Sequence, residues 1–245
     1  MIKIAIFCVS YQSEIERDAY LSSIDTAIQN SNGSVSVDIF VANNTKENNP
    51  GYFGAVKQLM EKVNVTDYDY SIISNVDLVI EKDFFIKLAN YKCPKDIGWI
   101  APQIWSNLEK RDRNPKILNR YSRNKLNILK AMYKYPILDT LYTHTLYRRK
   151  ETDNHPIEQI YSGHGSFIIL TREYFKQCGK IDYPVFLFCE EIYLAEKCQN
   201  ARLRVKYEPN IKVIDTEHAS TSMMGHKYYC RCNYEAIQYI IKTFY

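Results

Sequence analysis

Hydrophobic and polar positions along the chain alternate between two periods. Short apolar runs predict buried strands, and segments with apolar positions three or four residues apart predict helices. Strands are expected at residues 3–9, 35–41, 70–80, 98–102, 165–170, 202–207 and 211–214, and helices at 15–28, 53–63, 82–90, 172–178, 192–200 and 228–245. This alternation is typical of an α/β protein with a mostly parallel sheet flanked by helices.

One segment interrupts the alternation. Residues 104–160, called the basic insertion below, hold tyrosines, leucines and prolines that favour helical or irregular structure. From Trp105 to Lys150 there are twelve Lys or Arg against three acids, so this stretch carries +9 while the whole chain carries +4 and the remainder −5. Such asymmetry predicts a surface for phosphate groups or anionic lipid, with a solvated basic helix pair or a subunit contact as the alternatives. No nucleic-acid recognition motif accompanies the charge, so nucleic-acid binding is not expected.

The composition is that of an ordinary globular chain. Of its 245 residues, 46% are hydrophobic and 24% charged, and no apolar run approaches the roughly 20 residues that span a membrane. The first residues lack a signal-peptide pattern, so a cytoplasmic protein of one domain is expected. The seven cysteines are scattered, without the C-x-x-C pair that is typical of zinc or redox sites. Cys230 and Cys232 lie close together in the sequence, but no function is expected of this pair.

Two acidic sites stand out. Asn75-Val76-Asp77 follows an apolar run, at the carboxyl end of a strand where α/β sheets bind ligands. The Asn and Asp oxygens suit Mg²⁺ or Mn²⁺, and the alternative is a capping turn. Glu190 and Glu191 also follow an apolar stretch. These two carboxylates either take part in chemistry or occupy a helix N-terminus, where the helix dipole favours acids.

Five motifs occur in the order found in family-2 glycosyltransferases. They lie at residues 49–55 (NPGYFGA), 75–77 (NVD), 163–172 (GHGSFIILTR), 178–209 and 218–222 (HASTS). Over about residues 3–103 and 160–245, the sequence resembles this family of GT-A-fold enzymes and is most similar to bacterial rhamnosyltransferase-like members.

The resemblance implies a role for each matching residue. It implies a divalent metal, Mg²⁺ or Mn²⁺, at Asp77 and His218, and catalysis by Glu191 as the base with Glu190 holding the acceptor or orienting its partner. The implied donor-binding residues are Ser10, Tyr11, Asn43, Asn49, Gly51, Gly54, Asn75 and Asp77.

The sequence departs from the family pattern at three positions. Glu191 stands where the family usually has Asp, so which glutamate is the base stays open. Asn43 stands where many members have an Asp that pairs with the nucleobase of the donor. The identity of the nucleobase therefore stays open as well. Tyr193 replaces the second acid of the E-D-x-D pattern.

The expected organisation is one GT-A domain with a nucleotide-sugar-binding half (1–103), the basic insertion on the acceptor side (104–160), and an acceptor and catalytic half with a C-terminal helix (161–245). The expected function is inverting, metal-dependent transfer of a sugar from a nucleotide-diphosphate donor to a hydroxyl of a glycan or lipid-linked acceptor. The setting implied is bacterial surface polysaccharide synthesis, with peripheral contact to the inner membrane surface.

Two other functions stay open. One is a catalytically silent relative that binds a nucleotide sugar or a glycan. The other is a sugar nucleotidyltransferase, which is disfavoured because a Gly-rich loop with Arg and Lys normally follows its first strand. Here that place holds Ser10-Tyr11-Gln12-Ser13.

Overall fold

An eight-stranded sheet forms the centre of the protein. The computed structural model describes residues 1–143, 159–216 and 224–245, and the strand order in this part is β2-β1-β3-β7-β5-β8-β4, with β6 paired to β5. The strands are β1 (Ile2–Tyr11), β2 (Val35–Asn44), β3 (Tyr70–Asn75), β4 (Leu78–Ile80), β5 (Ile97–Ser106), β6 (Arg111–Asp112), β7 (Phe167–Thr171) and β8 (Arg204–Asp215).

Most strands of this sheet run in one direction. β2, β1 and β3 are mutually parallel, and so are β5 and β8. β7 lies between β3 and β5 and is antiparallel to both, so the two parallel groups run in the same direction. The expected mostly parallel α/β sheet flanked by helices is confirmed.

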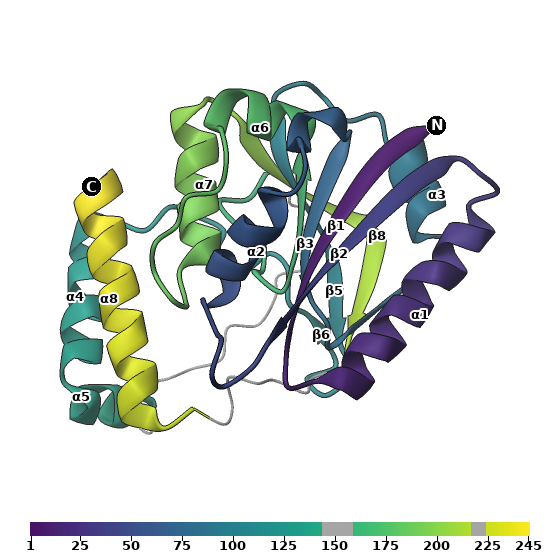
Figure 1. Cartoon of the computed structure of the whole chain (residues 1–245). Helices are drawn as coiled ribbons and strands as arrows, with labels where there is room; N and C mark the ends of the chain where they lie inside the picture. Colours follow the sequence, from purple (N-terminus) through teal and green to yellow (C-terminus); the bar gives the residue numbers. More distant parts are fainter. Residues whose placement is uncertain (144–158, 217–223) are drawn as a thin grey trace.

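Helices cover both faces of the sheet (Figure 1). α1 and α3 lie on one face, α2, α6 and α7 lie on the other, and α4, α5 and α8 form a bundle beyond α7. The helices are α1 (Glu14–Asn30), α2 (Tyr52–Met60), α3 (Phe84–Asn90), α4 (Arg123–Lys134), α5 (Pro136–Leu141), α6 (Arg172–Cys178), α7 (Glu190–Asn200) and α8 (His226–Phe244), with a 3₁₀ turn at Val65–Asp67.

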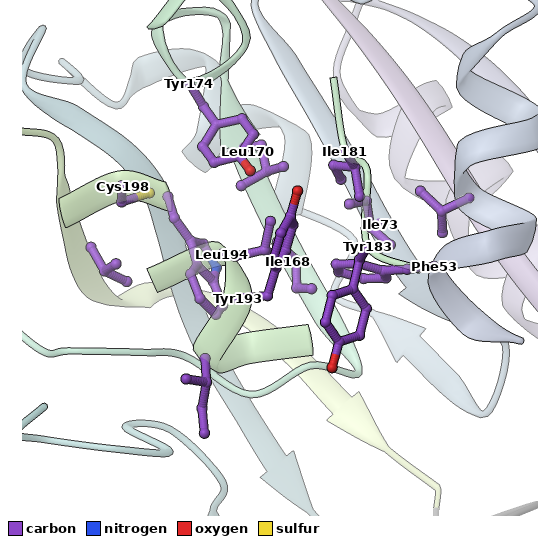
Figure 2. Packing of buried hydrophobic residues seen from close by; sticks show 14 of the residues in the cluster. Phe53, Ile73, Ile168, Leu170, Tyr174, Ile181, Tyr183, Tyr193, Leu194 and Cys198 are labelled. Atoms are coloured by element: carbon purple, nitrogen blue, oxygen red, sulfur yellow. The ribbon is translucent and has the colours of Figure 1, made fainter. Parts of the chain in front are cut away.

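The apolar runs of the sequence become the two cores. Alternate residues of β1 point to opposite faces, and both sets are buried because helices cover both sides. Phe53 of α2, Tyr174 of α6 and Tyr193 of α7 pack over the sheet on one face (Figure 2). On the other face, Tyr20 of α1 and Phe84 of α3 bury their rings completely.

Two strand predictions differ from the structure. Residues 70–80 were expected to form one strand, but they form β3 in the middle of the sheet and β4 at its edge, paired with β8. The predicted strands at 202–207 and 211–214 are one strand, β8, whose register to β5 shifts after Glu208. Pro209 lies in this irregularity, where its missing N–H interrupts no ladder hydrogen bond.

The described part of the basic insertion contains two helices and irregular backbone, as expected, but it also contains the end of β5 and the short strand β6. β5 continues through Ser106, and α4 and α5 follow after the short strand β6. α4 packs along α8, so the insertion docks on the C-terminal helix (Figure 1). Within the described ranges, no helix combines the length and apolar character that crossing a membrane requires.

Candidate functional site

The carboxyl ends of β1, β2 and β3 lie side by side at one edge of the sheet. Strand register pairs Ser10 with Asn43 and Tyr11 with Asn44, and it pairs Val9 with Asn75. Ser10 is buried, whereas Asn43 is exposed and accepts a hydrogen bond from Nη1 of Arg17 at 3.1 Å. Predicted donor residues from three separate segments thus share one edge.

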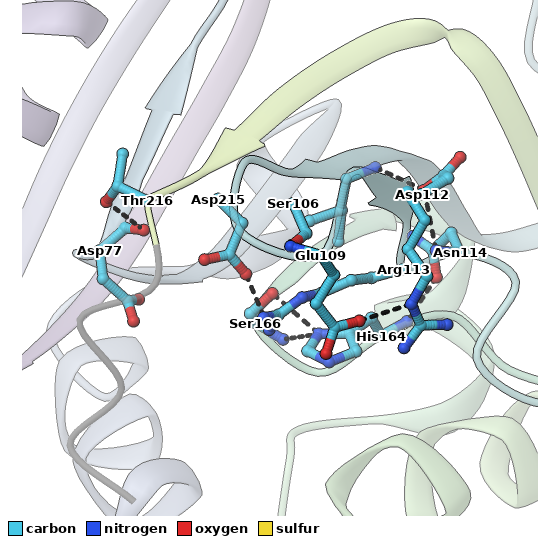
Figure 3. A network of polar contacts seen from close by, with 12 residues as sticks. Asp77, Ser106, Glu109, Asp112, Arg113, Asn114, His164, Ser166, Asp215 and Thr216 are labelled. Carbon is cyan, nitrogen blue, oxygen red and sulfur yellow. Dashed lines mark hydrogen bonds and ion pairs between the residues drawn. The ribbon is translucent and has the colours of Figure 1, made fainter. Parts of the chain in front are cut away.

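The Asn75-Val76-Asp77 turn joins this edge to two other segments. The main-chain N–H of Asn75 donates to the carbonyl oxygen of Ser166 at 2.9 Å. The carbonyl oxygen of Asp77 accepts hydrogen bonds from the main-chain N–H of Thr216, at 3.1 Å, and from its hydroxyl, at 2.9 Å. Figure 3 shows the Asp77 carboxylate on the side of the residue away from Thr216. The turn is therefore fixed through its backbone, which positions the carboxylate.

The loop before α2 is fixed by its own side chains. Oδ1 of Asn49 accepts hydrogen bonds from the N–H of Gly51 at 3.0 Å and from Nδ2 of Asn44 at 3.1 Å. Gly51 has φ +82° and ψ 179°, a region that is essentially restricted to glycine. Gly54 lies in the first turn of α2, against the ring of Pro50. In the structure, Asn49 and Gly51 shape the loop that leads into α2.

Tyr52, the first residue of α2, connects the loop at residues 49–51 to the acidic pair Glu190 and Glu191. Its hydroxyl donates to the carbonyl oxygen of Gly165 at 3.1 Å. A Cβ on Gly165 would lie 3.7 Å from Oε2 of Glu191, so the Glu191 carboxylate faces the same short loop. Burial raises the pKa of the Tyr52 phenol well above its usual value, and the charges of Glu190 and Asp77 raise it further. Tyr52 therefore joins the loop at residues 49–51 to the loop that the Glu191 carboxylate faces.

The two glutamates at the start of α7 have different surroundings. Glu190 is buried, and its Oε1 accepts the main-chain N–H of Phe188 at 3.0 Å. This contact closes a turn in which Phe188 and Cys189 both have positive φ. Burial, together with the adjacent charge of Glu191, raises the pKa of Glu190 to about 8. Glu190 is thus a buried carboxyl group with a raised pKa that holds the turn before α7.

The basic insertion reaches this acidic pair. Burial raises the pKa of Tyr121, which precedes α4, and the charge of Glu191 is the next cause. On the core side, the pKa of Tyr183 is raised by burial and also by Glu190 and Glu191. The Tyr183 hydroxyl donates to the carbonyl oxygen of Phe188 at 2.6 Å, and the Phe188 ring packs on Tyr229, which packs on Tyr133 of α4. The turn before the acidic pair therefore lies between the aromatic core and the insertion.

A polar network links the hairpin of β5 and β6 to the loop around His164 (Figure 3). Arg113 pairs with Asp215, the buried last residue of β8, at 2.9 Å. Oδ1 of Asn114 accepts the main-chain N–H of His164 at 2.7 Å. Burial and the nearby Lys116 and Arg113 lower the pKa of His164 well below its usual range, so the imidazole is neutral. Its Nδ1 then accepts the N–H of Ser166 at 3.2 Å.

This network supports the backbone next to Asp77. The main-chain N–H of Ser166 is held by His164, and the Ser166 carbonyl oxygen accepts the N–H of Asn75. Asp215 is held by Arg113 and directly precedes Thr216, which donates to Asp77. His164, Arg113 and Asp215 were not among the predicted site residues, nor was Tyr52. Tyr52 and His164 lie inside motifs that resemble the family, but only the fold shows which segments they join.

The residues present at the turn fit a divalent cation. Asp77 offers a half-buried carboxylate, with the amide of Asn75 two residues before it. Mg²⁺ and Mn²⁺ are commonly held by one or two carboxylates, with substrate phosphates completing the coordination. The second predicted ligand, His218, lies outside the described residues.

Comparison with known proteins identifies the fold. No protein-family model matches the sequence, and a search of curated proteins finds no match. Among solved structures, the catalytic domain of Drosophila β1,4-galactosyltransferase 7 in complex with xylobiose matches with a TM-score of 0.52 at 15% identity, over 94% of this chain and 80% of that one. Residues 1–349 of Staphylococcus aureus TarS match with a TM-score of 0.54 at 9% identity, over 88% of this chain and 60% of that one.

The chain has the GT-A fold. A further match is a mutant of the same galactosyltransferase in complex with manganese, UDP-Gal and xylobiose, with a TM-score of 0.50 at 16% identity, over 94% of this chain and 74% of that one. At this identity the likeness concerns the fold, and it says nothing about the individual side chains of this chain.

Proposed function

We propose that this protein is an inverting, metal-dependent glycosyltransferase of the family-2, rhamnosyltransferase-like type. It moves a hexosyl group from a nucleotide-diphosphate donor to a hydroxyl of a glycan or lipid-linked acceptor. The setting is the cytoplasm of a bacterium, in surface polysaccharide synthesis. Residues 1–103 supply the donor site, and residues 161–245 together with the basic insertion supply the acceptor side.

One observation carries the proposal. The hydroxyl of Tyr52 contacts the carbonyl oxygen of Gly165, and Gly165 lies against Glu191. The next residue, Ser166, accepts the main-chain N–H of Asn75 in the candidate metal turn at 2.9 Å. The donor loop, the candidate metal turn and the acidic pair thus converge on one place, although they come from distant parts of the sequence. Inverting transfer needs these functions together, because the acceptor must lose a proton while the diphosphate leaves.

The two glutamates receive different roles. Glu191 is the proposed base, because its carboxylate faces the loop at Gly165. Glu190 is the proposed positioning residue, because its buried carboxyl is bound to Phe188. When bound at Asp77, with His218 as the second proposed ligand, Mg²⁺ or Mn²⁺ would supply positive charge to the departing diphosphate. Ser10, Tyr11 and Asn43 would bind the nucleoside at the neighbouring strand ends.

The acceptor side is proposed to contact an anionic membrane surface through α4. This helix carries Arg123, Lys125, Lys130 and Lys134 and no acid. Lys and Arg near an anionic bilayer contribute about 1 kcal/mol each. Ile128 is 69% exposed and lies one helical turn from Lys125, so apolar and basic side chains share this surface.

The experiment that tests the transferase proposal combines donor binding with turnover. Melting temperatures are measured with UDP, dTDP and GDP and their sugars, with and without Mn²⁺. For a ligand at a hundred times its Kd the stabilisation is about 2.7 kcal/mol, which corresponds to about 5–10 °C in a chain of this size. We expect such a metal-dependent shift with one nucleotide class.

Variants identify the site. Asp77→Ala should lose the Mn²⁺-dependent shift, whereas Asp25→Ala, which removes an exposed carboxylate on α1, should keep it. Glu191→Gln should keep the shift and lose about 10²–10⁴-fold in turnover. An unchanged shift in Asp77→Ala would refute the metal assignment. Donor binding by the wild type without turnover of any acceptor would instead support the silent relative.

A further inference from the structure

A cluster of three metal-ligating side chains joins α5 to α8, outside the site described above. Asp139, His226 and Cys230 each offer one ligand atom, and the three atoms lie within 4.8 Å of one another. Nε2 of His226 is 2.8 Å from Oδ2 of Asp139 and 3.5 Å from Sγ of Cys230. Sγ of Cys230 is 3.8 Å from the same Asp139 oxygen.

The sequence presents this cluster through helix periodicity. His226 and Cys230 are four residues apart on α8, so their side chains lie on one face of the helix. α5 packs against this part of α8 and brings Asp139 (Figure 1). Cys230 is fully buried and Asp139 nearly so, whereas the His226 side chain is 47% exposed. The buried ligands are therefore fixed in place, and an ion can enter on the side of the imidazole.

The geometry favours convergence on an ion over a proton relay. In a Cys-His-Asp relay the acid and the thiol contact opposite nitrogens of the imidazole. Here Asp139 and Cys230 both contact Nε2. Tetrahedral Zn²⁺ with usual bond lengths sets its N, O and S ligand atoms about 3.3–3.6 Å apart. The three separations of 2.8, 3.5 and 3.8 Å approach this arrangement within about half an ångström.

We propose that Asp139, His226 and Cys230 bind Zn²⁺ and that the ion clamps the basic insertion to the C-terminal helix. The ligands are Oδ2, Nε2 and Sγ, an O, N and S set that suits Zn²⁺. The Zn–S bond forms as the Cys230 thiol releases its proton to solvent, and water takes the fourth position. The site does not depend on the proposed glycosyltransferase activity.

The test is Zn²⁺ binding by the full chain after removal of metal with a chelator. Titration against a chromophoric chelator should give one Zn²⁺ per chain. Cys230→Ser and His226→Gln should each weaken binding at least tenfold. Cys232→Ser is the matched control, because Cys232 is also a buried cysteine on α8 but lies outside the cluster. With Co²⁺ in place of Zn²⁺, thiolate-to-metal charge-transfer absorption should appear in the control and be lost in Cys230→Ser.

Other outcomes would overturn the proposal. If the wild type binds no Zn²⁺, or if both cluster variants bind it as the wild type does, the cluster is only a hydrogen-bonded contact between helices. His226→Gln tests the site without the risk that the variant misfolds, because the half-exposed His226 side chain can be replaced without opening the core. Asp77→Ala should retain Zn²⁺, and Cys230→Ser should retain any Mn²⁺-dependent donor shift, so failure of one proposal is distinguishable from failure of the other.

Discussion

Among single residues, Gly51 shows why one position of the loop before α2 tolerates no side chain. A Cβ at this position would lie 2.1 Å from the carbonyl oxygen of Phe186. The next residue, Tyr52, donates its main-chain N–H to the same oxygen at 3.3 Å. The loop before α2 and the segment before the acidic pair thus meet backbone to backbone, and a side chain at Gly51 would separate them.

We expect Gly51→Ala to destabilise the protein more than a strained glycine alone would. Gly179 is the matched control, because its φ of +73° and ψ of −163° lie in the same glycine region while nothing lies within 4 Å of an added Cβ. Backbone strain costs about 1–3 kcal/mol at either site. The clash with Phe186 should add about 2 kcal/mol at Gly51. Urea unfolding of both variants measures the difference, and equal losses would contradict the contact.

The sequence predicted the importance of this loop but not its physical cause. Asn49 and Gly51 were assigned to donor binding by resemblance. The structure shows Asn49 holding the N–H of Gly51, and Gly51 packed against Phe186. The second contact joins segments far apart in the chain, so no local pattern could reveal it. Their roles toward a donor remain predictions.

At the scale of elements, α4 combines a docked face with a basic one. Leu126 is buried against the rest of the protein, whereas Ile128 and Ile137, in α4 and α5, are 69% and 71% exposed. Arg123 donates to the carbonyl oxygen of Tyr245 at 2.7 Å, and Arg120, just before the helix, pairs with Glu196. These two arginines link the insertion to α7 and to the end of α8, whereas Lys125 lies over the ring of the neighbouring Tyr121. Replacing the lysines therefore lowers the charge of α4 without breaking the links that the arginines make.

Replacing Lys125, Lys130 and Lys134 together by Gln should weaken binding to vesicles that contain phosphatidylglycerol. At about 1 kcal/mol for each lysine, the loss is about a hundredfold at low salt. The control replaces the exposed Lys46, Lys62 and Lys92 by Gln, which lowers the net charge of +4 by the same three units. Sedimentation with vesicles measures both variants. Equal binding by the two would indicate that α4 is only a solvated helix.

Strand patterns were easier to predict than strand neighbours. The apolar residues of 70–80 were expected as one strand because β3 and β4 are both buried and only two residues separate them. The chain turns at Val76 and Asp77, and β4 then pairs with β8. Which strand accepts β4 depends on contacts across the sheet, and periodicity carries no information about these contacts.

At the scale of the whole molecule, Glu196 holds the basic insertion, α7 and the end of α8 together. Its carboxylate is 1% exposed and accepts hydrogen bonds from Nε and Nη2 of Arg120, at 2.7 and 3.0 Å. The hydroxyls of Tyr161 and Tyr245 donate to Oε1 at 2.7 and 3.1 Å. The sequence predicted the α/β rhythm and the insertion, but it gave no sign of this junction, since its four residues come from four separate segments.

We expect Arg120→Met to loosen this junction. Removing one partner of a buried pair costs about 3–5 kcal/mol. The Arg120 side chain is 37% exposed and the two tyrosines still donate, so about 2 kcal/mol is expected here. Arg231→Met is the control, because its pair with Glu235 is exposed on both sides and should change stability by less than about 0.5 kcal/mol.

Adding Glu196→Gln tests whether the loss comes from the pair itself. The double variant leaves no buried charge at the junction, so it should recover part of the stability that Arg120→Met loses, with a coupling energy of about 0.5–3 kcal/mol. Amide hydrogen exchange should become faster in α4 of Arg120→Met, because the helix loses an anchor beside its N-terminus. If the two substitutions are additive and exchange in α4 is unchanged, the insertion is held by its apolar contacts with α8 rather than by this buried charge.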